Sequence, residues 1–83
     1  MKHTKPSKKL SQAIMQIRTD LGLNQRDMAS KLGTSAMAVS RWESGVNEPD
    51  GKSLVALSKM TKKPDIYWLL LGALGLTKRD LRG

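Results

Sequence analysis

Apolar residues recur at intervals of three and four near the start of the chain, which is the spacing of one face of an α-helix. Ser7 precedes this stretch and can cap a helix. Gly22 follows it, and glycine is the residue type that most easily adopts the left-handed conformation at a helix end. The pattern therefore predicts a first helix between these two residues. Its buried face is expected to comprise Leu10, Ala13, Ile14, Ile17 and Leu21.

Two shorter helices are predicted next. The first covers residues 25–32 and lies between a capping residue, Asn24, and a terminating glycine, Gly33. The second covers residues 36–44 and ends before Gly45. No alternation of the kind that marks a β-strand is present in this region or elsewhere in the sequence.

The connection between these two helices is short. It contains Gly33, and either Thr34 or Ser35 is expected to cap the second helix. Two short helices joined by a turn of three or four residues with a glycine form the helix-turn-helix pattern. Ala29 is small at the point where the two helices must approach closely. We therefore expect a helix-turn-helix at the second and third helices.

Two further helices complete the expected fold. Residues 46–51 contain asparagine, proline, aspartate and glycine and are expected to form a loop. A fourth helix is predicted over residues 52–61, and a fifth over about residues 65–71 with Pro64 in its first turn. The sequence thus predicts an all-α domain of five helices. The inward-facing residues of the fourth helix are expected to be Leu54, Leu57 and Met60.

The two ends of the chain differ in composition from its middle. Residues 1–6 are polar and without periodicity, so we expect a flexible basic arm there. The helical domain is expected over residues 7–76, followed by a short basic tail over residues 77–83, in which 78–81 could form one more turn. The formal net charge is +8, and most of the excess lies within residues 1–9, which carry +4, and residues 77–83, which carry +2. Such a charge favours an anionic partner.

Composition argues against several classes of function. The chain has 83 residues, no cysteine and a single histidine, His3, so a metal site is not expected. The apolar run from Ile66 to Leu76 is shorter than the roughly 20 residues of a membrane-spanning helix, and no signal peptide is evident. No serine–histidine–acid group, carboxylate pair or phosphate loop is present. We therefore expect a cytoplasmic protein that is not an enzyme. We expect it to use no cofactor or small-molecule substrate and to bind no membrane.

The third predicted helix has two chemically distinct sides at about 100° per residue. Val39, Trp42 and Glu43 lie on one side, where the two large apolar residues can face the core. The opposite arc has little bulk near the backbone, as entry into a major groove about 12 Å wide requires. Its members are Ala36, Met37, Ser40, Arg41 and Ser44.

The outward arc offers chemistry suited to DNA. Arg41 can donate two hydrogen bonds to O6 and N7 of guanine, and Ala36 and Met37 can contact thymine methyl groups. Ser40 and Ser44 can donate to bases or phosphates. Backbone N–H groups at the starts of the second and third helices can bind phosphate oxygens.

A specific set of residues falls in a familiar order between positions 10 and 72. Through them the chain resembles the phage-repressor/Cro-like helix-turn-helix family, also called the Xre family. The resemblance implies a five-helix, lambda-repressor-like domain that binds operator DNA, usually as a symmetric dimer. The residues that carry it are Gln25, Ala29, Gly33, Trp42-Glu43, Gly45, Pro49 and Trp68-Leu69-Leu70-Leu71-Gly72.

The resemblance also implies roles for single positions. Base contacts are expected at Ala36, Met37 and Arg41, to which the chemistry of the arc adds Ser40. Arg18 and Glu43 are expected to form an ion pair between the first and third helices. Backbone contacts to DNA are expected at Asn24, Gln25 and Ser35, and Ser44 is added as a further phosphate contact.

The start of the third helix departs from the family pattern. Relatives often carry glutamine, arginine or serine there, whereas this sequence has Ala36-Met37-Ala38. Readout by hydrogen bonds is therefore expected to be poor at this point. The alternatives are contact with the methyl groups of A·T pairs or greater dependence on DNA shape.

The apolar fifth helix is expected to have two roles. One face, with Ile66, Leu69, Leu70 and Ala73, can close the core. The other face would stay partly exposed and is the expected dimer contact, because relatives often pair through this region. Its residues are Tyr67, Trp68 and Leu71.

The leading hypothesis is a sequence-specific transcriptional regulator, more specifically a repressor that binds a pseudo-palindromic operator as a homodimer. The alternative is an antitoxin or protein-interaction module of a toxin–antitoxin operon, in which residues 74–83 could contact the partner. The basic arm at residues 1–6 is either a solubilising tail or an arm that wraps DNA.

Overall fold

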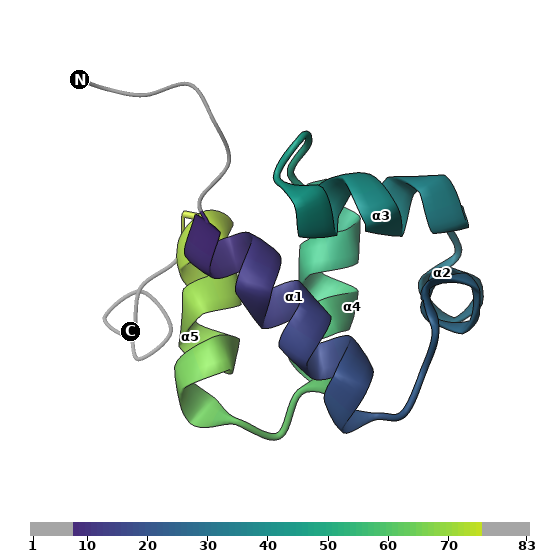
Figure 1. Ribbon diagram of the computed structural model, residues 1–83. Helices are drawn as coiled ribbons and strands as arrows, with labels where there is room; N and C mark the ends of the chain where they lie inside the picture. Colours follow the sequence, from purple (N-terminus) through teal and green to yellow (C-terminus); the bar gives the residue numbers. More distant parts are fainter. Residues whose placement is uncertain (1–7, 76–83) are drawn as a thin grey trace.

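Five helices follow one another along residues 8–75, the part of the chain that the computed structural model describes (Figure 1). No strand is present within these residues. The expected all-α fold of five helices is therefore confirmed. The helices are α1 (Lys8–Asp20), α2 (Gln25–Leu32), α3 (Ala36–Ser44), α4 (Gly51–Met60) and α5 (Pro64–Ala73).

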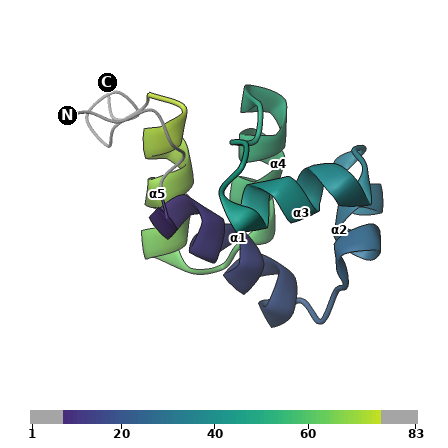
Figure 2. The same cartoon turned by 45° about the horizontal axis from the view of Figure 1, so that its top comes forward.

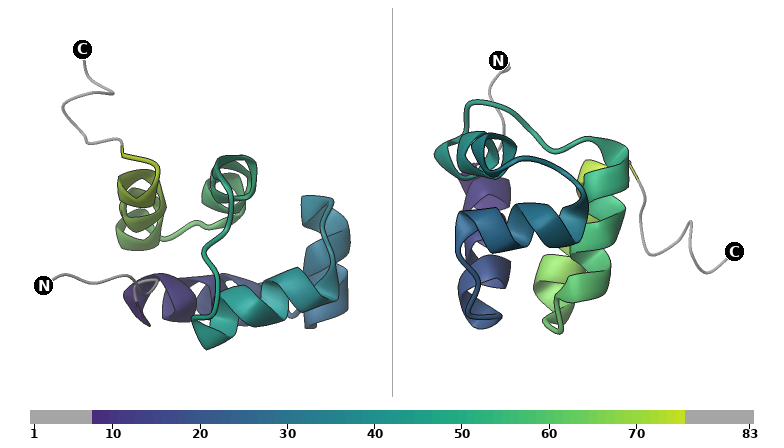
Figure 3. Two further views of the ribbon diagram at one scale, coloured as in Figure 1. Left: turned by 90° about the horizontal axis from the view of Figure 1, so that it is seen from above. Right: turned by 90° about the vertical axis from the view of Figure 1, so that its right-hand side faces the viewer.

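The helices pack in two layers with α2 at one side. α4 and α5 run antiparallel beside each other, and α1 lies across them (Figures 1 and 3). α3 lies in the layer of α1 and contacts α1 and α2. In Figure 1, α2 is seen end-on and α3 lies across the view. In the right-hand panel of Figure 3, α3 is seen end-on and α2 lies across the view. The two helices of the helix-turn-helix are therefore steeply crossed. No helix within residues 8–75 has the length and apolar character needed to cross a membrane.

The core takes apolar side chains from every helix. Val39 and Trp42 are the buried residues of α3, and they anchor this helix on the rest of the domain. Because all five helices share one cluster, none of them can be displaced without exposing apolar surface. The largest fully buried side chains are Ile14, Ile17, Met28, Val39, Leu57 and Leu70.

Side-chain caps fix where the central helices begin. The amide N–H of Asp27 donates to Asn24 Oδ1 at 2.7 Å, and that of Ala38 donates to Ser35 Oγ at 3.1 Å. Ser35, rather than Thr34, therefore caps α3. α4 begins one residue earlier than predicted because Asp50 is its cap.

Glycines end the two helices of the motif, as the sequence predicts. Gly33 follows α2 with φ 72°, and Gly45 follows α3 with φ 80°. Residues with a side chain rarely adopt this left-handed conformation. The short turn between α2 and α3 therefore depends on the glycine at position 33.

Three burial predictions at helix ends are wrong. Leu21 is 43% exposed because α1 ends at Asp20, so Leu21 no longer lies on the buried face of that helix. Ala73 is exposed at the last position of α5, which extends two residues beyond the predicted end. Leu71 was expected to be partly exposed but is only 6% exposed. It lies one turn before Leu74, which packs against the core, so this side of α5 is covered.

Some predictions concern the ends of the chain and lie outside the described residues. They are the basic arm at 1–6, the helix cap at Ser7, the turn at 78–81 and the basic tail at 77–83.

Two methionines allow a matched test of the core. Met28 is fully buried, whereas Met37 is 64% exposed. Met28→Ala removes packed atoms and leaves a cavity, so we expect the free energy of unfolding to fall by about 2–5 kcal/mol. Met37→Ala removes the same atoms from the surface and should change it by less than about 0.5 kcal/mol. Urea unfolding followed by circular dichroism measures both, and equal losses would contradict the described core.

Candidate nucleic-acid interface

The outward side of α3 is exposed to solvent. Val39 is 0% and Trp42 is 6% exposed, so two large apolar side chains hold the helix against the core. No other helix lies in front of α3 in Figure 2. The structure thus shows the two-sided helix that the angular pattern predicts. All members of the predicted outward arc are exposed: Ala36, Met37, Ser40, Arg41 and Ser44.

Arg41 is the charged group of this exposed arc. Within residues 8–75 its guanidinium takes part in no ion pair or side-chain hydrogen bond. All five of its N–H donors are therefore available to a ligand in a planar arrangement. Such a group can bind two acceptors at once, as guanine or a phosphate requires.

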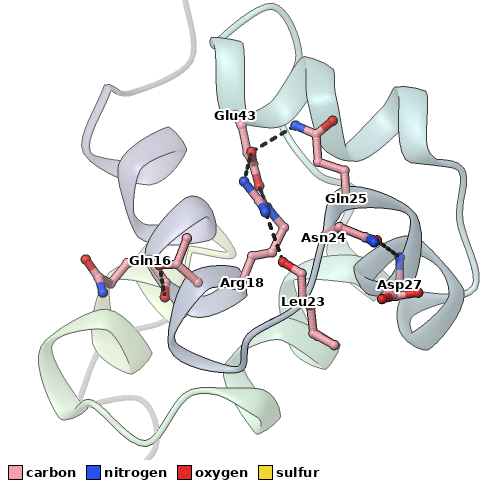
Figure 4. A network of polar contacts seen from close by, with 8 residues as sticks. Gln16, Arg18, Leu23, Asn24, Gln25, Asp27 and Glu43 are labelled. Atoms are coloured by element: carbon pink, nitrogen blue, oxygen red, sulfur yellow. Dashed lines mark hydrogen bonds and ion pairs between the residues drawn. The ribbon is translucent and has the colours of Figure 1, made fainter.

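The inward side of α3 carries a carboxylate that is paired with α1. Arg18 Nε lies 2.6 Å from Glu43 Oε2, and Arg18 Nη2 lies 3.1 Å from Glu43 Oε1 (Figure 4). The Glu43 side chain is only 3% exposed. This two-bond contact raises the pKa of Arg18 above its ordinary value, chiefly through the hydrogen bond to Glu43. The two helices are therefore joined by an ion pair, as the resemblance implies.

Two further hydrogen bonds extend this ion pair into a network. Arg18 Nη1 donates to the carbonyl oxygen of Leu23 at 3.0 Å, and Gln25 Nε2 donates to Glu43 Oε1 at 3.0 Å (Figure 4). α1, the turn before α2, the first residue of α2 and α3 are thereby tied together. The Leu23 carbonyl was not predicted as a partner, because its direction depends on the backbone of a turn.

The candidate phosphate contacts differ in the donors that they retain. The oxygens of Asn24 and Ser35 accept the capping bonds, which leaves the Asn24 amide group and the Ser35 hydroxyl hydrogen to donate. Gln25 uses one N–H on Glu43 and retains a second. The hydroxyl of Ser44 donates to the Arg41 carbonyl oxygen at 3.2 Å, so a phosphate would have to compete with that bond.

A family model described as helix-turn-helix matches residues 14–68, which is more than half of the chain and includes all of α2, α3 and α4. This chain belongs to the helix-turn-helix family. The resemblance to phage-repressor and Cro-like regulators is therefore confirmed. α2 and α3, which the spacing predicts as the motif, lie entirely within the matched range.

Three relatives of this helix-turn-helix protein are transcription regulators by name. HTH-type transcriptional regulator DicA of Escherichia coli K12 is 44% identical over 55 residues, which are 66% of this chain and 40% of DicA. Repressor protein C2 of Salmonella phage P22 is 39% identical over 61 residues, or 72% of this chain and 27% of C2. HTH-type transcriptional activator BcrR of Enterococcus faecalis is 39% identical over 49 residues, which are 59% of this chain and 24% of BcrR. The chain thus matches less than half of each relative, and no solved structure matches it significantly.

Two partly exposed aromatic side chains of this helix-turn-helix protein lie on α5. Tyr67 and Trp68 are both half-buried, and their rings meet edge to face with centroids 5.2 Å apart. Leu71 cannot join them as a dimer contact without rearrangement, because it is buried. Of the three predicted contact residues, only the two aromatic ones are accessible.

The buried ion pair gives a test of how α3 is held. Arg18→Met leaves the Glu43 carboxylate buried without its counter-charge, and we expect the free energy of unfolding to fall by about 3 kcal/mol. This expected loss is at the lower end of the range for buried ion pairs because the Arg18 side chain remains 17% exposed. Removing Glu43 as well, in Arg18→Met/Glu43→Met, should restore part of the loss.

The control for this test is the exposed ion pair between Lys63 and Asp20, whose Nζ and Oδ2 atoms lie 3.0 Å apart. Lys63→Met should destabilise much less, because solvent screens exposed charges. Urea unfolding of the three variants measures the difference. An Arg18→Met variant as stable as Lys63→Met would show that the network does not hold the helices together.

Proposed function

We propose that this protein is a sequence-specific, double-stranded DNA-binding transcriptional regulator that places α3 in the major groove. The observation that carries the proposal is the exposure of Arg41 and its neighbours on a helix anchored from the other side by Val39 and Trp42. A helix held in this way can enter a groove without exposing the core. The family membership and the names of the relatives support the same function.

Each exposed side chain of α3 has a role in this proposal. Arg41 donates to O6 and N7 of guanine, and Ser40 donates to a neighbouring base edge. Ala36 and Met37 lie against the bases at the start of the helix. Asn24, Gln25 and Ser35 donate to phosphates on either side of the groove and so fix the position of α3. Ser44 joins them by exchanging its bond to the Arg41 carbonyl oxygen for one to a phosphate.

Electrostatics favour this placement. Glu43 is the only acidic residue of α3, and its charge is turned inward and neutralised by Arg18. The outward side of the helix is therefore free of negative charge and carries Arg41. α2 adds two exposed positive charges, Arg26 and Lys31, against one exposed acid, Asp27. A polyanion is thus attracted to this side of the domain.

The proposal includes a symmetric dimer on DNA. Tyr67 and Trp68 on α5 offer a partly exposed aromatic surface that a second copy can cover. A two-fold dimer would read a pseudo-palindrome whose half-sites lie about 34–36 Å apart. We place this protein in the cytoplasm, where a dimer bound to such an operator represses transcription by excluding RNA polymerase. One relative is a repressor by name.

The main test is selection of bound sites from random duplexes, followed by titration of the selected duplex in fluorescence anisotropy. We expect Arg41→Ala to weaken binding to the selected site by about 1–3 kcal/mol, or roughly five- to 150-fold, because a two-bond contact to a base is lost. Binding to unrelated duplexes should change less. The selection should return an inverted repeat.

The matched control is Lys59→Ala, which removes an exposed positive charge from the far end of α4. It should leave specific affinity almost unchanged. Affinity of the unaltered protein should fall steeply with salt, since phosphate contacts release counterions. Equal effects of Arg41→Ala and Lys59→Ala, or no enriched sequence at all, would contradict the proposed function.

A further inference from the structure

The start of α3 is apolar and open to solvent. Met37 is 64% exposed, which is more than any other large apolar side chain among residues 8–75. Ala36 before it is also exposed, and Ala38 after it is half-buried. None of the three side chains can donate a hydrogen bond, and the thioether is at most a weak acceptor. Whatever these three side chains recognise must therefore be recognised by apolar contact.

The major groove offers one apolar group to such a surface. The four bases present hydrogen-bond donors and acceptors there, and only thymine adds a methyl group, on C5. Cytosine methylated on C5 presents the same group at the same place. The flexible, polarisable side chain of methionine adapts well to an apolar partner.

We propose that Met37, with Ala36 beside it, recognises the C5-methyl group of a pyrimidine and accepts thymine and 5-methylcytosine alike. This inference rests on the proposed function of α3. Thymine and 5-methylcytosine differ in the groove by a carbonyl oxygen and an amino group at C4. A side chain that neither donates nor strongly accepts hydrogen bonds cannot distinguish these two groups.

The helix geometry also places this contact relative to that of Arg41. The two residues are four positions apart, which is about one turn and about 6 Å along the helix axis. Successive bases of one strand are about 3.4 Å apart along the duplex. Any tilt of α3 shortens the projected distance. When the two side chains extend in the same direction, the methylated pyrimidine therefore lies about two base pairs or fewer from the guanine that Arg41 contacts.

The test separates the methyl group from the base pair that carries it. At each pyrimidine within two base pairs of the conserved guanine of the selected half-site, four duplexes are prepared with thymine, deoxyuridine, 5-methylcytosine or cytosine. Affinity is measured by anisotropy at one salt concentration. At one position we expect the two methylated bases to bind equally and about fourfold more tightly than the two others, from the burial of one methyl group.

Variants show whether Met37 is the source of the effect. Met37→Ala should bind all four duplexes with nearly equal affinity, which also excludes an effect of the methyl group on DNA shape alone. Met37→Gln has a similar length but carries an amide, and it should discriminate by base pair instead. Met15→Ala removes another exposed methionine, on α1 and 42% exposed, and should keep the fourfold effect.

Two results would overturn the proposal in different ways. If affinity follows the base pair at every position, or if the methyl effect persists in Met37→Ala, Met37 does not read methyl groups, although α3 still binds DNA. If no duplex is bound specifically and Arg41→Ala changes nothing, the proposed function itself is wrong. Circular dichroism of each variant, which should match the unaltered protein, ties a loss of affinity to the contact rather than to unfolding.

Discussion

The contact between Arg18 and Glu43 is the interaction on which the arrangement of the recognition surface depends. A carboxylate that is 3% exposed on the inner side of α3 needs a counter-charge and hydrogen-bond donors, because burying it alone would cost several kcal/mol. Arg18 supplies both from α1, and Gln25 supplies a further donor from the start of α2. The position of α3 is thereby fixed relative to both helices that precede it.

The opposite side of α3 follows from this arrangement. Val39 and Trp42 are packed in the core, Ala38 is half-buried against it and Glu43 is neutralised, so the other side chains of the helix are exposed to solvent. They are small, flexible or positively charged. The exposed side of such a helix can contact the anionic DNA groove without burying an acidic side chain against the phosphates. Stability and recognition thus use different sides of the same nine-residue helix.

Most of the fold could be predicted from local sequence, because caps and glycines mark where the central helices begin and end. Asn24, Gly33 and Gly45 do so through their own backbone and side-chain chemistry. The exposure of Leu21 and Ala73 and the burial of Leu71 could not be predicted in this way, since they depend on where helices end. The ion pair was implied by family resemblance, whereas its extension to the Leu23 carbonyl and the bond of Ser44 to its own helix required coordinates.

The central claim is that the exposed side of α3, braced by its buried side, is the surface that meets DNA. The most direct measurement is a titration of ¹⁵N-labelled protein with a selected duplex, followed by amide chemical shifts in NMR spectra. The account predicts the largest changes at Asn24, Gln25 and Ser35 and along α3, with small changes on the outer faces of α1 and α5. Large changes confined to α1 and α5, with α3 unaffected, would contradict it.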